Sequence, residues 1–162
     1  AMRLRQRGFT LIEMVVVLTI VGILALAAQP LHELALRRTQ EALLRHALRE
    51  LRTAIDEHRK AVLARQVAPG SEGSVYPATL ESLVTGVALI DEQGQPRQQG
   101  KLYLLRRLPR DPFADPALSA ADSWGQRASN SPPDAPQRGA DVFDVFSRSE
   151  AAALDGTRYR DW

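Results

Sequence analysis

The sequence has no cysteine and few aromatic residues. None of its 162 residues is a cysteine, and aromatic residues make up 6% of the chain. A disulfide therefore cannot stabilise the fold outside the cytoplasm, and a zinc site built on thiolates is excluded. The length suffices for one small domain with an appendage.

Glycine and proline are scarce in the first part of the chain and common after Ala68. Residues 31–65 contain neither, and their apolar residues recur at helical spacing. These apolar positions are Leu34, Leu44, Leu48, Leu51, Ile55 and Val62. Charged residues fill the other face: Arg37, Arg38, Glu41, Arg45, Arg49, Glu50, Arg52, Asp56, Glu57, Arg59 and Lys60. We expect an amphipathic helix that is half buried on a partner and half solvated.

A run with little charge precedes this helix. Residues 9–28, FTLIEMVVVLTIVGILALAA, hold one charged residue, Glu13. Twenty helical residues span about 30 Å, which is the thickness of a bilayer core. We expect residues 9–29 to form a transmembrane helix that continues into an amphipathic half at 30–66, over about 85 Å in all. Pro30 is expected to bend this helix or to open it locally.

The first eight residues are short, basic and polar. They hold three arginines, Arg3, Arg5 and Arg7, of the 21 lysines and arginines in the chain. Without these three, 18 basic residues face 19 acidic ones, and the net charge is −1. A nucleic-acid partner then lacks its electrostatic basis. The arginines also predict that the N-terminal end stays in the cytoplasm.

The second part of the chain is expected to form a small globular domain over residues 67–162. A linker at 67–73 leads into a short helix at 78–84. Strands are predicted at 101–107, 123–129 and 141–147, with polar or proline-rich loops at 86–100, 108–116 and 130–139. The apolar face of the long helix needs a partner, and a small antiparallel sheet supplies it, which makes the fold α+β.

Two ordinary explanations compete for residues 1–28. A secretory signal peptide shares the basic residues, the apolar run and small residues at Ala25 and Ala27. Against it, Glu13 interrupts the apolar region, and the helical pattern continues past the supposed cleavage region. A simple membrane anchor leaves Glu13 unexplained, because a carboxylate inside a membrane segment is costly and normally has a partner or a function.

The run RGFTLIE at residues 7–13, followed by the apolar stretch, resembles the type IV pilin and pseudopilin superfamily. The resemblance implies that a prepilin peptidase cleaves after Gly8 and methylates the new amine of Phe9. It also implies that Glu13 pairs with the Phe9 amine of a neighbouring subunit that is entering a filament. An ammonium group in this place relieves the cost of a carboxylate in lipid and sets the register.

Two further residues of the apolar helix, Gly22 and Pro30, match positions at which family members have a helix-loosening glycine and proline. The resemblance implies that the helix opens between them on assembly and packs against copies of itself. It further implies contacts with minor pseudopilins and with an assembly platform in the bacterial inner membrane. The chain is then a single-pass protein of that membrane whose C-terminal domain lies in the periplasm.

Motifs of the second part are similar, in order, to those of the G-type major pseudopilins of type II secretion. They are Tyr76-Pro77, Leu80–Leu83, Leu108–Phe113, Trp124-Gly125 and Asp141–Ser147. The resemblance implies a non-enzymatic subunit of a periplasmic pseudopilus that drives protein export. A minor pilin or pseudopilin, or a type IV pilus subunit, stays open, because the same N-terminus serves these roles. An alternative of another class is a periplasmic binding or enzyme domain behind a cleaved signal peptide.

The calcium loop of that family, rich in glycine and aspartate, has no clear counterpart near the C-terminus. Asp155 and Asp161 offer oxygens, but calcium requires about six or more. Acidic residues in a terminal turn are more often solvated or capping, so we expect no metal and no cofactor, with calcium at Asp155 and Asp161 as the weaker alternative.

No catalytic set is expected either. His32, His46 and His58 lie on the long helix without a shared spacing of four residues, and we expect them at its surface or at an interface. Ser147 has no histidine near it in sequence, and no nucleophile-elbow motif is present. Trp124 and Trp162 are expected to pack in the sheet domain.

Overall fold

A computed structural model describes residues 9–162, without the side chains of residues 27–30. The chain divides into two compact units, which we call the N-terminal unit, up to Thr39, and the C-terminal unit, Gln40–Trp162. The domain boundaries expected from the sequence at residues 8/9, 29/30 and 66/67 stay predictions.

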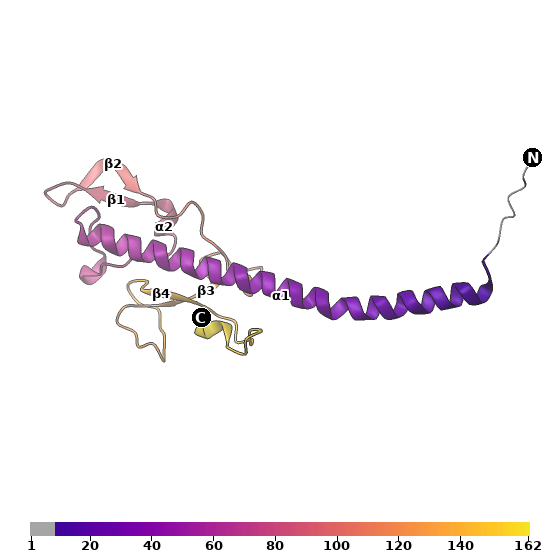
Figure 1. Ribbon diagram of the computed structural model, residues 1–162. Helices are drawn as coiled ribbons and strands as arrows, with labels where there is room; N and C mark the ends of the chain where they lie inside the picture. Colours follow the sequence, from indigo (N-terminus) through magenta and orange to yellow (C-terminus); the bar gives the residue numbers. More distant parts are fainter. Residues whose placement is uncertain (1–8) are drawn as a thin grey trace, which may run out of the picture. The chain divides into compact units, whose positions relative to one another are not determined.

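Helix α1, Leu11–Leu63, confirms the predicted long helix (Figure 1). Thr10 begins it, because the backbone N–H of Glu13 donates to the Thr10 Oγ1 at 3.3 Å, an N-cap arrangement. It ends with Arg65 in the left-handed region, at φ 55°. There the N–H of Gln66 bonds the Ala61 carbonyl at 2.9 Å, and that of Arg65 bonds Val62 at 3.0 Å. This pattern is a Schellman C-cap, with arginine in the place usually taken by glycine.

The described residues of the C-terminal unit form two antiparallel strand pairs. Strand β1, Val87–Ile90, pairs with β2, Pro96–Leu102, and β3, Trp124–Arg127, pairs with β4, Asp144–Ser147. Figure 1 draws the first pair above the C-terminal half of α1 and the second pair below it. The predicted small antiparallel sheet is thus confirmed as two separate two-stranded sheets. The short helices are α2, Ser82–Thr85, and the 3₁₀ turns η1, Ser71–Gly73, and η2, Tyr159–Asp161.

The local predictions for this unit are partly wrong. A loop was expected at 86–100, but these residues hold β1, a turn and most of β2. The Asp91 carboxylate makes the turn by accepting from the N–H of Gln93 at 3.0 Å and of Gln95 at 2.8 Å. The strand expected at 101–107 ends at Leu102. The strands expected at 123–129 and 141–147 are present but shorter, and the short helix begins later than expected.

The main core lies between α1 and the β3–β4 pair. The apolar residues of α1 from Leu44 to Ile55 pack there with Trp124, Val145 and Tyr159. A second cluster joins the end of α1 to the β1–β2 pair, and consists of Ala61, Val62, Val67, Val75, Val87, Leu89 and Leu102. Five of the six predicted apolar helix positions are buried, whereas Leu34 is exposed. Glu41, expected on the solvated face, is only 8% exposed.

Candidate assembly site

The residues predicted for assembly lie at the N-terminal end of α1. Phe9, 74% exposed, precedes the helix, and Glu13 lies in its first turn, where the helix dipole favours a carboxylate. In the part of the chain that the structure describes, the Glu13 carboxylate has no hydrogen bond or ion pair. Gly8, the predicted residue before the cleavage point, lies outside the described residues.

The apolar part of α1 presents its side chains outward. All the large apolar residues from Leu11 to Leu26 are exposed, and among the described residues this helix is long and apolar enough to cross a membrane. The hydroxyl of Thr19 donates to the Val15 carbonyl at 2.7 Å, so this polar group is satisfied within the helix. The Glu13 carboxylate is then the polar group of this stretch that still needs a partner. A continuous apolar surface of this kind marks contact with lipid or with another protein.

Gly22 and Pro30 both lie inside α1. Apart from the adjacent residues and the backbone of the helix itself, no heavy atom lies within 4 Å of the place that a Cβ on Gly22 would take, so packing within the monomer does not require a glycine there. A small residue on an apolar helix allows the close approach of another helix. The predicted opening of the helix between Gly22 and Pro30 stays a prediction.

In the C-terminal unit, the predicted motif at 108–113 is the centre of a hydrogen-bond network. Asp111 is 1% exposed, and its carboxylate accepts from the N–H of Phe113 at 2.8 Å and from the Ser147 hydroxyl at 2.6 Å. Its own N–H donates to Ser123 Oγ at 3.2 Å. Asp111 therefore links the proline-rich loop to β4, and the role of this motif is to stabilise the fold.

The Trp124-Gly125 motif also has a packing role. The Trp124 ring is buried, and its Nε1–H donates to the Pro109 carbonyl at 2.9 Å. A Cβ on Gly125 would overlap the ring of Phe146 on the paired strand. Glycine is needed here for the close approach of that ring. Trp124 and Trp162 both pack with the core, as predicted.

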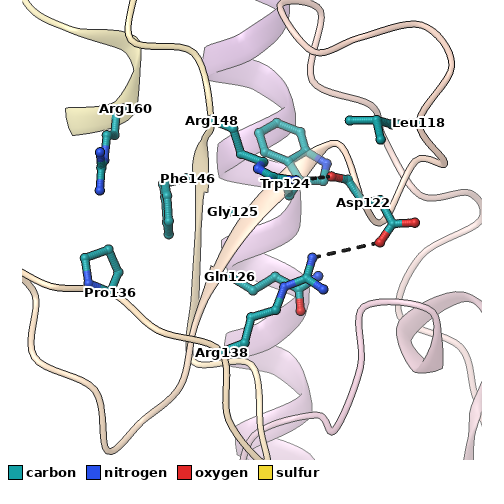
Figure 2. A pocket seen from close by; sticks show the side chains of 10 residues that line it. All are labelled: Leu118, Asp122, Trp124, Gly125, Gln126, Pro136, Arg138, Phe146, Arg148 and Arg160. Atoms are coloured by element: carbon teal, nitrogen blue, oxygen red, sulfur yellow. Dashed lines mark hydrogen bonds and ion pairs between the residues drawn. The ribbon is translucent and has the colours of Figure 1, made fainter.

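Figure 2 shows a groove over β3 and β4 that is lined by Phe146 and by three arginines, Arg138, Arg148 and Arg160. Arg138 pairs with the Asp122 carboxylate at 3.9 Å, and Arg148 donates to the Asp122 carbonyl at 3.3 Å. The side chains that line it include no histidine, serine or lysine. Arginine beside an aromatic ring is typical of protein-contact surfaces.

The two acidic residues considered for calcium are engaged otherwise. Asp155 Oδ1 accepts from the N–H of Thr157 at 3.0 Å and from its hydroxyl at 2.6 Å, and Oδ2 pairs with Arg45 at 3.2 Å. The Thr157 hydroxyl is the main cause that lowers the pKa of Asp155. Asp161 pairs with Arg158 at 3.3 Å. Among residues 9–162, no three His, Cys, Asp or Glu side chains are grouped to hold a metal. These donors do not fit calcium, which takes six to eight oxygens.

The three histidines of α1 differ in their surroundings. His32 and His46 are exposed, as expected for a helix surface. His58 is buried, which the sequence did not predict, and its Nδ1 lies 3.1 Å from the Val75 carbonyl. A carbonyl only accepts, so Nδ1 carries the hydrogen of a neutral ring. Burial lowers the pKa of His58, and this hydrogen bond opposes the shift in part.

Sequence reasoning also missed three charged residues of α1, Glu41, Arg45 and Arg52. The sequence assigns them to the solvated face, but they bind the end of the C-terminal unit. Their partners at this end of the chain lie 110 or more residues away in sequence. A local pattern carries no signal for such contacts.

Comparisons with known proteins support the predicted family. Residues 3–29 match the model of the prokaryotic N-terminal methylation motif. The chain is also similar to the type II secretion system core protein G of Pseudomonas aeruginosa. The two are 32% identical over 114 residues, which cover 70% of this chain and 72% of that protein. No solved structure matches the chain.

Proposed function

The chain belongs to the family of the type II secretion system core protein G, and from this membership we propose that it is a structural subunit of a pseudopilus. The observation that carries the proposal is the exposed apolar part of α1 with its carboxylate, Glu13, that has no partner among the described residues. Such a surface suits a bilayer before assembly and copies of the same helix afterwards. The relative is named a core protein of a secretion system, which supports a structural role over catalysis.

The N-terminus is proposed to be processed before assembly. The basic residues before Gly8 favour a cytoplasmic N-terminus, which directs the C-terminal unit to the periplasm. Prepilin peptidase then cuts after Gly8 and methylates the Phe9 amine. The methylation-motif match over residues 3–29 supports this processing.

Glu13 is proposed to pair with the Phe9 amine of the neighbouring subunit. Phe9 is exposed ahead of the helix and Glu13 is exposed one turn inside it, so both residues are accessible to another chain. In a low-dielectric surrounding, an unpaired carboxylate is costly, and pairing with an ammonium relieves this cost. Opening of the helix between Gly22 and Pro30 accompanies this step. The inner-membrane assembly platform and minor pseudopilins are the further proposed partners.

Mass spectrometry of the protein isolated from membranes tests the processing. We expect a mature chain that begins with methylated Phe9. A mature N-terminus near Ala28 would instead indicate an ordinary signal peptide, and would overturn the proposal.

Substitution of Glu13 tests the pairing. Glu13→Ala is expected to be inserted and cleaved normally, but to assemble at least tenfold less, because one charge pair per subunit contact is lost. Glu33→Ala, which removes an exposed carboxylate further along α1, is the matched control and should assemble normally. Normal filaments from Glu13→Ala would exclude the pairing role.

The absence of cysteine allows orientation to be tested with one introduced thiol and copy number with a pair of them. Ser71→Cys places it on an exposed turn of the C-terminal unit. A membrane-impermeant maleimide should label it from the periplasmic side in intact spheroplasts. Thiol pairs placed across neighbouring subunits should give a ladder of homotypic products if this is the major subunit. A single dimer band would point to a minor pseudopilin.

A further inference from the structure

The C-terminal segment, residues 148–162, is held against α1 by three charged residues of the helix. Glu41, Arg45 and Arg52 follow one another at intervals of four and seven residues, which places them along one stripe of α1. We call these three residues the C-terminal clamp. Each binds the segment through its own contacts.

Glu41 binds the middle of the segment. Its Oε1 accepts from the N–H of Leu154 at 2.8 Å and from the hydroxyl of Tyr159 at 2.9 Å. The Tyr159 ring is itself fully buried, and it stacks on Phe113 with the ring centroids 4.0 Å apart. Hydrogen bonds to a buried carboxylate are strong, and the carboxylate is costly without them.

The two arginines bind the turn and the end of the segment. Arg45 pairs with Asp155 at 3.2 Å and stacks its guanidinium 4.2 Å from the centroid of Trp162. Arg52 donates to the Asp144 carboxylate at 2.8 Å and to the Trp162 carbonyl at 2.8 Å. Arg52 therefore connects β4 to the end of the segment.

The segment also closes on itself. The Ala153 N–H bonds the Thr157 carbonyl at 2.7 Å, and the Trp162 indole N–H bonds the Thr157 hydroxyl at 2.6 Å. That hydroxyl in turn donates to Asp155 Oδ1, while Arg45 occupies Oδ2. Both Asp155 oxygens thus have donors, which a cation would have to displace.

We propose that the C-terminal clamp and the hydrogen bonds within the segment close it, so that the subunit folds without bound calcium. In the family that the sequence resembles, a calcium loop lies near the C-terminus. Here a buried carboxylate and two guanidinium groups of α1 take its place. The proposal concerns the fold of the C-terminal unit, and it stands whether or not the chain assembles into a pseudopilus.

Thermal unfolding of the full chain in detergent, followed by tryptophan fluorescence, tests the proposal. The unfolding midpoint is expected to agree within about 1 °C in excess EGTA and in millimolar CaCl₂, since a ligand that does not bind does not stabilise.

Variants of the clamp test its contribution to stability. Glu41→Ala should lower the unfolding midpoint by about 5 °C or more, because a buried hydroxyl and an amide lose their acceptor. Arg45→Ala should lower it by about 1–3 °C, because its ion pair is half exposed. Lys60→Ala, which removes an exposed pair with Glu57 on the same helix, is the control and should leave it unchanged.

Calcium rescue is the decisive comparison. If Asp155 belongs to a cation site, Arg45→Ala frees one of its oxygens, and CaCl₂ should restore the midpoint. A clear rise of the midpoint with calcium, in the natural chain or in Arg45→Ala, would overturn the proposal. Should Glu41→Ala fail to fold, Glu41→Gln keeps an acceptor oxygen and should give an intermediate midpoint that calcium does not change. Calorimetric titration of the natural chain with CaCl₂ should show no binding heat.

Discussion

The two units of the chain differ in where their side chains find partners. In the N-terminal unit, the apolar side chains from Leu11 to Leu26 are exposed, and Glu13 has no partner among the described residues. In the C-terminal unit, most apolar residues of the same helix are buried from Leu44 onward, although Leu63 at its end is exposed. Across the described residues, no buried side-chain nitrogen or oxygen lacks a hydrogen bond. The first unit thus exposes its apolar side chains, whereas the second buries its apolar side chains in a core of its own.

The largest expected effect is a loss of stability in the C-terminal unit, and two adjacent leucines of α1 test it. Leu44 is fully buried and Leu43 is 57% exposed. Leu44→Ala should lower the free energy of unfolding of the C-terminal unit by about 2–5 kcal/mol, because it leaves a cavity. Leu43→Ala should change it by less than about 0.5 kcal/mol. Urea unfolding followed by tryptophan fluorescence measures both, and equal losses would contradict the assigned core.

The next effect concerns the exposed half of the helix. Leu18→Arg places a charge near the centre of the apolar stretch, where it costs about 2.5–3.5 kcal/mol of membrane insertion. We expect much less protein in the membrane fraction after carbonate extraction, and an unchanged unfolding midpoint of the C-terminal unit in detergent. Leu18→Ile is the control and should be retained in the membrane. A lowered midpoint in Leu18→Arg would show that the two units are not independent.

The smallest effect is a pH dependence confined to the C-terminal unit. Burial lowers the pKa of His58 below its ordinary value of 6.5. As the pH falls, His58 therefore takes up a proton at a higher pH in the unfolded chain than in the folded one. The stabilising contribution is complete above about pH 6.5 and is lost as the pH falls towards the lower folded pKa. The unfolding midpoint should therefore drop by a few degrees between pH 7.5 and 5.5. His58→Gln should flatten this dependence, and the exposed His46→Gln should keep it.

Asp141 gives the C-terminal unit a second pH dependence of stability, in more acidic solution. Burial alone would raise the pKa of Asp141, but hydrogen bonds from Ser74 and from the N–H and hydroxyl of Ser129 together lower it. Its contribution is complete above its ordinary value of 3.8 and is lost as the pH falls below it. The His58 and Asp141 contributions therefore belong to separate pH ranges.

The sequence predicted the features that depend on local pattern. The helical spacing of apolar residues predicted α1 and most of its buried face, and the alternation at 141–147 predicted β4. The sequence did not predict the hairpin of β1 and β2. Strand β2 is mostly polar and exposed, and it has Pro96 at its start and Gly100 within it. Its pairing depends on the apolar cluster at the end of α1, which joins distant parts of the chain.

The functional residues also divide into those that a local motif predicts and those that only the fold reveals. The motif at residues 7–13 is contiguous, so the sequence alone suffices to predict roles for Phe9 and Glu13, and these roles stay predictions. Glu41 looks like any other charge on an amphipathic helix, and its burial becomes visible only once Tyr159 is placed against it. A periodic pattern assigns faces to a helix, but it does not say which polar residue at the edge of a face will be covered.

The C-terminal clamp also has a consequence for the timing of synthesis. Glu41 and Tyr159 are 118 residues apart in sequence, and Arg52 and Trp162 are 110 apart. A ribosome completes the helix long before it reaches these partners, and contacts of such separation form late. Glu41 therefore lacks its partners until Leu154 and Tyr159 have been made. The C-terminal unit is therefore closed only when residues 148–162 dock on α1, and a chain that is arrested before Tyr159 keeps the Glu41 carboxylate without its tyrosine partner.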